Sequence, residues 1–187
     1  MQPLGAQQVV VMGVSGVGKS TVAKGLSTVL GWTYAEGDAF HSEANVAKMA
    51  AGHPLTDEDR WAWLRSIGSW MSEQIASGQP SVVTCSALRR PYRDVLREGR
   101  PEVRFCHLVG GESQVAVRMG HRRDHYMPTS LLQSQYDTLE PLAPDEPGVE
   151  VTIDGSAAEV IDRALAALDL RAPPVTDEGG APGTSPC

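Results

Sequence analysis

A stretch near the N-terminus, residues 8 to 21 (QVVVMGVSGVGKST), constrains the fold most strongly. Its first part, residues 9–12, is uncharged and largely β-branched, which predicts a strand buried on both faces. Residues 13–20 then match the phosphate-loop pattern GxxxxGK[ST]. The glycines allow the backbone to form a concave nest of N–H groups, and the helix that follows adds the positive end of its dipole. The stretch therefore predicts a site for a nucleoside triphosphate.

The loop assigns a role to several residues. Lys19 is expected to reach the β- and γ-phosphates, and the hydroxyl of Ser20 is expected to ligate Mg²⁺. Apolar residues at helical spacing follow at Val22 and Leu26, so the motif lies between a strand and a helix, as it requires. The nucleotide-binding residues predicted from the motif are Gly13, Val14, Ser15, Gly16, Val17, Gly18, Lys19, Ser20 and Thr21.

Composition excludes several classes of partner. A net charge of −7 argues against general affinity for nucleic acids or anionic membranes, which need clustered Lys and Arg. The three cysteines, Cys85, Cys106 and Cys187, form neither a disulfide framework nor a metal-ligand spacing, and suit a reducing cytosol. No apolar run approaches the roughly 20 residues of a membrane span. We therefore expect a cytoplasmic protein with no nucleic-acid or membrane partner.

Strands and helices are expected to alternate along the chain. Strands are predicted at 9–12, 32–35, 81–85, 103–109 and 149–153, with helical patterns between them. This alternation favours an α/β fold with a five-stranded parallel sheet covered on both faces. We expect one domain over residues 1–170, followed by a Pro- and Gly-rich disordered tail at 171–187.

Polar residues cluster after the second predicted strand. Ligands of α/β sheets bind beyond the carboxyl ends of the strands, so Asp38 is expected to share a rim with the phosphate loop. It could act as the base for an attacking hydroxyl or hold Mg²⁺ through water, and the sequence leaves both roles open. His41 follows, and Asn45 and Lys48 lie three apart on one face of a short predicted helix.

Arginines mark three further places. Arg60 falls in the first turn of a predicted helix, where a cation is unfavourable, so either an acidic neighbour or a ligand compensates its charge. The run of arginines after the third strand favours anion binding by Arg89 or Arg93. Arg118 and Arg122 lie four apart on a helix at 113–123, and residues 112–140 form a plausible lid over phosphates.

Three segments carry a family resemblance. Residues 37–64, GDAFHSEANVAKMAAGHPLTDEDRWAWL, resemble the signature of the gluconokinases. CSALRRPYRDVLR at 85–97 and HYMPTSLLQSQYDTLEPL at 125–142 are similar to two further segments of that family, so the resemblance covers roughly residues 8–168. The chain departs from the usual pattern at Ser42, Ala62 and Asp124, and the last replaces a glycine of the lid.

The resemblance implies transfer of the γ-phosphoryl group of ATP to the 6-hydroxyl of D-gluconate, with Mg²⁺. It implies a three-layer P-loop kinase fold, similar to nucleoside monophosphate kinases, with a helical lid, and related enzymes favour a homodimer. Implied catalytic residues are Lys19, Asp38 and Arg122. Arg118 is implied to contact adenine near a turn at 154–156, and gluconate is assigned to Asp38, His41, Asn45, Lys48, Arg60, Arg89 and Arg93.

Two other functions remain alternatives. One is another small-molecule P-loop kinase, acting on shikimate or a nucleotide. The other is a nucleotide-dependent switch without enzymatic activity. Such switches usually carry an Asp at the end of an apolar strand, whereas residues 84–86 read Thr-Cys-Ser, and the Asn-Lys-x-Asp motif of GTPases is absent.

Overall fold

The computed structural model describes residues 6–120 and 129–172. The predicted tail from 173 onward and the lid residue Arg122 lie outside these ranges. No helix in the described ranges is long and apolar enough to cross a membrane.

Five strands form one parallel sheet in the order β2-β3-β1-β4-β5. The strands are β1 (Gln8–Met12), β2 (Thr33–Ala35), β3 (Ser81–Thr84), β4 (Val103–Val109) and β5 (Gly148–Thr152).

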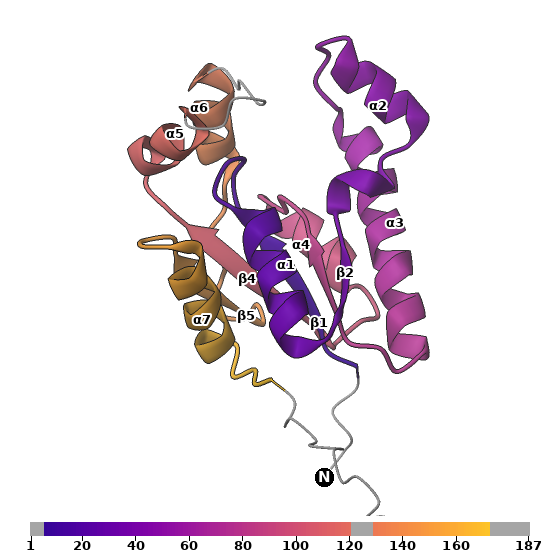
Figure 1. The fold of residues 1–187 in the computed structure, drawn as a ribbon. Coiled ribbons are helices and arrows are strands. Elements are labelled where there is room, and N and C mark those ends of the chain that lie inside the picture. Colours follow the sequence, from indigo (N-terminus) through magenta and orange to yellow (C-terminus); the bar gives the residue numbers. More distant parts are fainter. Residues whose placement is uncertain (1–5, 121–128, 173–187) are drawn as a thin grey trace, which may run out of the picture.

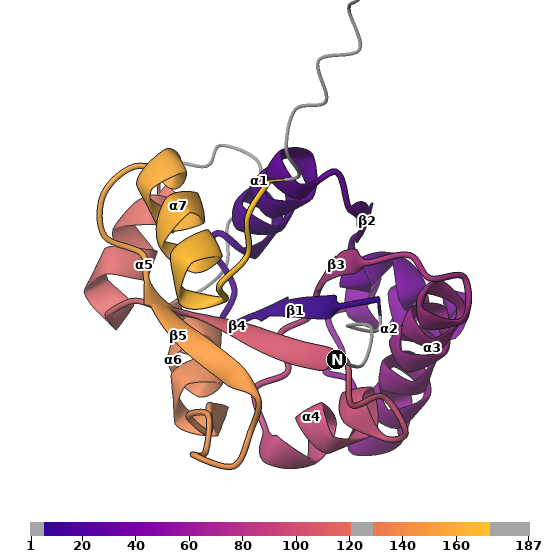
Figure 2. The ribbon, with the colours of Figure 1, turned by 90° about the horizontal axis from the view of Figure 1, so that it is seen from below.

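Helices cover both faces of this sheet, which confirms the three-layer α/β prediction (Figure 2). Helices α1 and α7 lie on one face, and α3 and α4 on the other. Above the sheet, α2 projects on one side of the phosphate loop, and α5 and α6 lie on the opposite side (Figure 1). The helices are α1 (Lys19–Leu30), α2 (Glu43–Ala50), α3 (Asp57–Ala76), α4 (Arg90–Arg97), α5 (Glu112–Gly120), α6 (Thr129–Thr138) and α7 (Ala157–Ala167).

Strand β1 is the centre of the core. Its side chains are fully buried, as predicted for a strand covered on both faces. Val9 and Val11 pack with α1 and α7, whereas Val10 and Met12 pack with α3 and α4, because successive side chains of a strand point to opposite faces. The strand therefore joins both halves of the hydrophobic core and ends at the phosphate loop.

The register of the sheet brings three connections to one edge. Val11 of β1 is level with Thr84 of β3, and Val83 of β3 is level with Ala35 of β2. Because all three strands run parallel, the segments that follow them leave the sheet at the same end. The phosphate loop, the turn at 36–38 and the segment at 85–89 are thus neighbours, as the sequence predicted for Asp38.

Helix α3 begins with a capping box. The Thr56 side chain accepts from the Asp59 backbone N–H, and the Asp59 carboxylate accepts from the Thr56 backbone N–H. Trp61 and Ile75 of this helix are only half-buried. Trp61 instead packs edge-on against Tyr92 of α4, with ring centroids 5.3 Å apart. The buried residues of α3 are Trp63, Leu64, Ile67, Gly68 and Met71.

The prediction that Arg93 binds an anionic ligand is wrong. Its guanidinium is buried and forms a bidentate pair with Glu146, with Nε–Oε1 at 2.6 Å and Nη2–Oε2 at 2.9 Å. Nη1 donates to the carbonyls of Ala87 and Glu140. Burial alone would raise the pKa of Glu146, but the hydrogen bonds from Arg93 hold it below its usual value. Arg93 therefore fixes α4 to the segment that precedes β5.

Removal of this buried pair should destabilise the fold. Glu146→Ala leaves a buried guanidinium without its carboxylate, so we expect the free energy of unfolding to fall by about 3–5 kcal/mol in urea denaturation. Asp145→Ala is the matched control, because Asp145 pairs with Arg90 at the surface, and exposed pairs contribute about 1 kcal/mol or less. Equal losses in the two variants would contradict a structural role for the Arg93–Glu146 pair.

Candidate active site

The phosphate loop joins β1 to α1 through glycines that other residues cannot replace without strain. Gly13, Gly16 and Gly18 have φ values of 138°, 80° and 103°. A Cβ on Gly13 would lie 2.8 Å from the carbonyl oxygen of Leu108, so the loop must also approach β4 closely. Lys19 Nζ donates to the carbonyls of Gly13 and Val14 at 3.1 and 3.0 Å. The ammonium group therefore lies over the loop that is predicted to hold phosphates.

Glu36 is a site residue that sequence reasoning missed. Its carboxylate accepts hydrogen bonds from the hydroxyls of Ser20, at 3.0 Å, and of Tyr34 and Thr84. Burial alone would raise the pKa of Glu36, but these donors outweigh it and keep the pKa below its usual value. Glu36 is thus an ionised carboxylate beside Ser20. Its place directly after a strand, in Glu-Gly-Asp, is the signal that could have identified it.

Gly37 holds the turn that carries Glu36 and Asp38. Its N–H donates to Thr84 Oγ1 at 3.0 Å, and its carbonyl accepts from Trp63 Nε1 at 2.7 Å. A Cβ at this position would lie 1.9 Å from the carbonyl oxygen of Thr84, so only glycine allows the turn to pack against β3. Residues 37–40 then form a short 3₁₀ turn. The carboxylate of Asp38 is 85% exposed and therefore open to a ligand.

His41 lies beneath Asp38 on a buried indole. The imidazole stacks on Trp63 with centroids 4.3 Å apart and an interplanar angle of 17°. Its Nε2 lies 4.0 Å from Oδ1 of Asp38. Burial lowers the pKa of His41, although the Asp38 charge opposes this, so the ring is neutral at pH 7. The His41 side chain is only 5% exposed, and its Nε2 is the atom that lies nearest to the Asp38 carboxylate.

The structure directs Asn45 and Lys48 toward α3. Asn45 is buried, and its Nδ2 donates to the carbonyl of Asp59 at 3.1 Å. Lys48 Nζ lies 2.7 Å from Oδ2 of Asp59. This hydrogen bond is the main cause that lowers the pKa of Asp59 to about 2. Both side chains therefore attach α2 to the start of α3, while Lys48 remains partly exposed.

Arg60 and Arg89 converge on one carboxylate. Nη1 of Arg60 lies 3.5 Å from Oδ1 of Asp57, and Nη1 of Arg89 lies 3.5 Å from Oδ2. The Tyr92 hydroxyl donates to Asp57 at 2.8 Å, and both guanidinium groups lie within 6.0 Å of its ring centre. Hydrogen bonding from Tyr92 and the nearby arginines hold the pKa of Asp57 below its usual value. The arginines are about two-fifths exposed, so further donors can face a ligand.

Asp57 thus supplies the acidic partner that the position of Arg60 required. Glu140, on the segment after α6, supplies a second carboxylate 3.8 Å from Nε of Arg89. The other Glu140 oxygen accepts from the backbone N–H of Arg90 at 2.6 Å. Arg89 is the N-cap of α4 and has no side-chain cap of its own, so Glu140 caps this helix from a distant segment.

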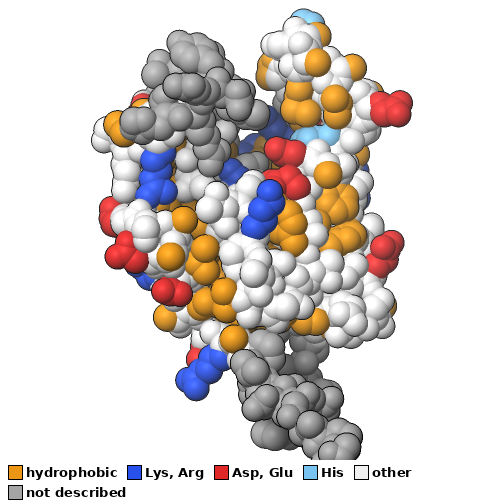
Figure 3. Space-filling view, viewed as in Figure 1, with side chains coloured by type: hydrophobic (Ala, Val, Ile, Leu, Met, Phe, Trp, Pro, Cys, Tyr) orange, Lys and Arg blue, Asp and Glu red, His pale blue; other side chains and the backbone are white. Residues whose placement is uncertain are grey.

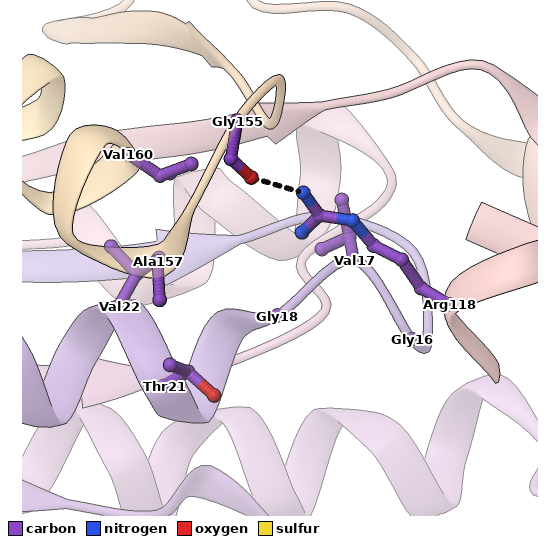
Figure 4. A pocket seen from close by; sticks show the side chains of 9 residues that line it. All are labelled: Gly16, Val17, Gly18, Thr21, Val22, Arg118, Gly155, Ala157 and Val160. Carbon is purple, nitrogen blue, oxygen red and sulfur yellow. Dashed lines mark hydrogen bonds between the residues drawn. The ribbon is translucent and has the colours of Figure 1, made fainter. Parts of the chain in front are cut away.

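A cavity of about 410 Å³ lies beside the phosphate loop (Figure 4). Arg118 of α5 reaches across it, and its Nη2 donates to the carbonyls of Ile153 and, at 3.2 Å, Gly155. The guanidinium is thereby fixed with its donors on the turn before α7. The residues that line the cavity are Gly16, Val17, Gly18, Thr21, Val22, Arg118, Gly155, Ala157 and Val160.

The predicted residues therefore form two groups around the phosphate loop. On the β4–β5 side lies the cavity with Arg118, and on the β2–β3 side lie Asp38 and the Arg60–Arg89 pair. Acidic, basic and histidine side chains gather on the hollowed face below α2 (Figure 3). Arg93 belongs to neither group, because its guanidinium is buried with Glu146.

No protein-family model matches the chain. Among curated proteins, gluconokinase of Gluconobacter oxydans strain 621H is 50% identical over 143 residues, which cover 76% of this chain and 80% of that protein.

Among solved structures, an unliganded sugar kinase from Janibacter sp. HTCC2649 is 52% identical with a TM-score of 0.82, covering 88% of this chain and 95% of that one. A gluconokinase from Sinorhizobium meliloti 1021 is 48% identical with a TM-score of 0.79, covering 88% and 93%. Identity at this level over most of both chains confirms the resemblance noted at residues 37–64. The chain belongs to the gluconokinase family.

Proposed function

We propose that the protein transfers the γ-phosphoryl group of ATP to the 6-hydroxyl of D-gluconate, giving 6-phospho-D-gluconate. One observation carries the proposal: three adjacent parallel strands end in the three groups that this reaction needs. The phosphate loop follows β1, the segment with Arg89 follows β3, and Asp38 follows β2. A triphosphate, a sugar-acid carboxylate and a reacting hydroxyl can therefore meet at one edge of the sheet.

Phosphoryl transfer depends mainly on positioning and on positive charge around the transferred group. We propose that Lys19 exchanges its contacts with the loop carbonyls for the β- and γ-phosphate oxygens. Asp38, exposed at the rim, orients the 6-hydroxyl and accepts its proton as the new O–P bond forms. The cavity at Arg118 takes the adenine, whose ring can lie against the guanidinium plane. The catalytic role of Arg122 remains a proposal that rests on the sequence alone.

Mg²⁺ fits the residues on the loop side of the site. Mg²⁺ prefers hard oxygen ligands and usually keeps several waters and substrate phosphates rather than a full set of protein ligands. The Ser20 hydroxyl, oriented by the ionised Glu36, offers one such ligand, and Glu36 can accept from metal-bound water. When bound, the ion would neutralise charge on the phosphates.

Arg60 and Arg89 suit the carboxylate of gluconate. A planar guanidinium can donate two parallel hydrogen bonds to a carboxylate, and both groups are already oriented by Asp57 and Tyr92. The Nε2 edge of His41 and the partly exposed Lys48 remain the proposed contacts for the hydroxyls. Asn45, also proposed for the hydroxyls from the sequence, is buried against α3, where its Nδ2 donates to the Asp59 carbonyl.

An acceptor panel tests the proposal against the other kinases considered above. The purified protein with ATP and Mg²⁺ should form ADP with D-gluconate, and the product should carry phosphate on O6. Shikimate, glucose and nucleoside monophosphates should give only the background rate. Equal hydrolysis with every acceptor, or a preference for shikimate, would contradict gluconate as the substrate while leaving the nucleotide site intact. We place this activity in the cytoplasm.

Replacement of Lys19 should remove the charge that stabilises the transferred phosphoryl group. For Lys19→Ala we expect kcat to fall at least about a hundredfold, with native circular dichroism. Turnover retained near the parent rate would overturn the assignment of the phosphate loop.

Asp38→Asn separates the two roles left open for this carboxylate. As a base, its loss should lower kcat by about 10²–10⁴-fold while nucleotide affinity, measured by calorimetry, stays unchanged. Loss of nucleotide binding instead would show that Asp38 mainly holds the metal ion.

The arginine pair should control affinity for the acceptor. Arg60→Gln or Arg89→Gln removes a charge-assisted hydrogen bond worth about 1.5–3 kcal/mol, so KM for gluconate should rise roughly 10- to 150-fold while KM for ATP changes little. Arg65→Gln, on the exposed side of the same helix as Arg60, is the control and should leave both constants unchanged. A rise in KM for ATP alone would place these arginines on the nucleotide.

A further inference from the structure

Helix α6 contacts the phosphate loop through a side chain that the proposed reaction does not yet use. The backbone N–H of Ser15, the third residue of the loop, donates to Oε1 of Gln135 across 2.6 Å. Gln135 is half-buried, and Leu132 on the same helix is buried in the cluster that contains Val14 and Val17 of the loop. A hydrogen bond and a shared apolar cluster therefore link α6 to the phosphate loop.

The segment after α6 joins the arginine side of the site. The backbone N–H of Glu140 donates to the carbonyl of Leu88 at 2.8 Å, and the Glu140 carboxylate caps α4 at Arg90 and pairs with Arg89. Gln135 and Glu140 are only five positions apart, and the Leu139 N–H donates to the Gln135 carbonyl at 2.9 Å. One short segment thus connects a loop amide to an acceptor-side arginine.

The chemistry of the side chain suits a phosphate site. An amide oxygen can accept from a loop N–H without adding negative charge, whereas a carboxylate in the same place would repel phosphate. Tyr136, the next residue, donates its hydroxyl to the carbonyl of Gly110 at 2.8 Å, which fixes the helix to the end of β4. Gln135 is therefore carried by a helix that is itself attached to the end of β4, as a positioning group requires.

We propose that Gln135 is a positioning residue that keeps the phosphate loop in its nucleotide-binding shape and, through Glu140, couples the nucleotide and acceptor sites. The proposed coupling to the acceptor site rests on the proposed function, whereas the proposed effect of Gln135 on nucleotide binding does not. Coupling between two binding sites is reciprocal, so gluconate should strengthen nucleotide binding by the same factor as nucleotide strengthens gluconate binding. The path runs from Ser15 through Gln135 and Glu140 to Arg89.

Calorimetry on matched variants tests this role. The probe is a non-hydrolysable ATP analogue with Mg²⁺, titrated with and without D-gluconate. For Gln135→Ala we expect a two- to tenfold loss of analogue affinity, the size of one neutral hydrogen bond. The factor by which gluconate increases analogue affinity should also fall, toward a value of one. Gln133→Ala is the control, because Gln133 is exposed on the same helix and bonds only Asp137 among its described contacts.

Two further variants separate the hydrogen bond from packing. Gln135→Met fills the same space without a carbonyl oxygen, so it should lower analogue affinity as much as Gln135→Ala does. It also serves as the test if Gln135→Ala, with its smaller side chain, does not fold. Gln135→Glu keeps the acceptor but adds a charge, and should weaken analogue binding more than Gln135→Ala, with a strong dependence on salt.

Unchanged or tighter analogue binding in Gln135→Met would overturn the positioning role, because Gln135 would then be passive or would compete with phosphate. An unchanged affinity ratio in that variant would overturn the coupling. Absence of gluconate turnover in the parent protein would instead refute the proposed function, while analogue affinities without acceptor would still decide the role of Gln135.

Discussion

The parallel pairing of β2, β3 and β1 is the constraint on which the site depends. Since their carboxyl ends share one edge, the turn with Asp38, the segment with Arg89 and the phosphate loop become neighbours without any long insertion. The close approach of Gly37 to Thr84 keeps this alignment, because a side chain there would force β2 away from β3. Position in the sheet, rather than any single contact, thus brings a phosphate donor and an acceptor together.

Around this edge, carboxylates hold the groups that face the ligands. Glu36 orients the Ser20 hydroxyl, and Asp57 holds Arg60 and Arg89 beside an aromatic ring. Each of these carboxylates has a pKa below its usual value, so both stay charged at neutral pH. Polar groups that are already oriented lose less freedom when a ligand binds, which favours both affinity and rate.

Much of this was predictable from the sequence. Local patterns with a fixed geometry, such as the phosphate loop and alternating strands, identified the sheet and placed Asp38 on its rim. Contacts between distant segments were not predictable: a run of arginines does not reveal that Arg93 meets Glu146, nor does any motif pair Ser15 with Gln135. Glu36 was missed because its role appears only when Ser20, on another element, lies beside it.

The most direct test is a crystal structure with a non-hydrolysable ATP analogue, Mg²⁺ and D-gluconate bound together. The account predicts the triphosphate in the loop at residues 13–20, the gluconate carboxylate on Arg60 and Arg89, and O6 within hydrogen-bond distance of Asp38 and in line with the γ-phosphate. A carboxylate bound elsewhere, with O6 turned away from Asp38, would contradict the claim that the segments after β1, β2 and β3 each supply one of the groups that the reaction needs.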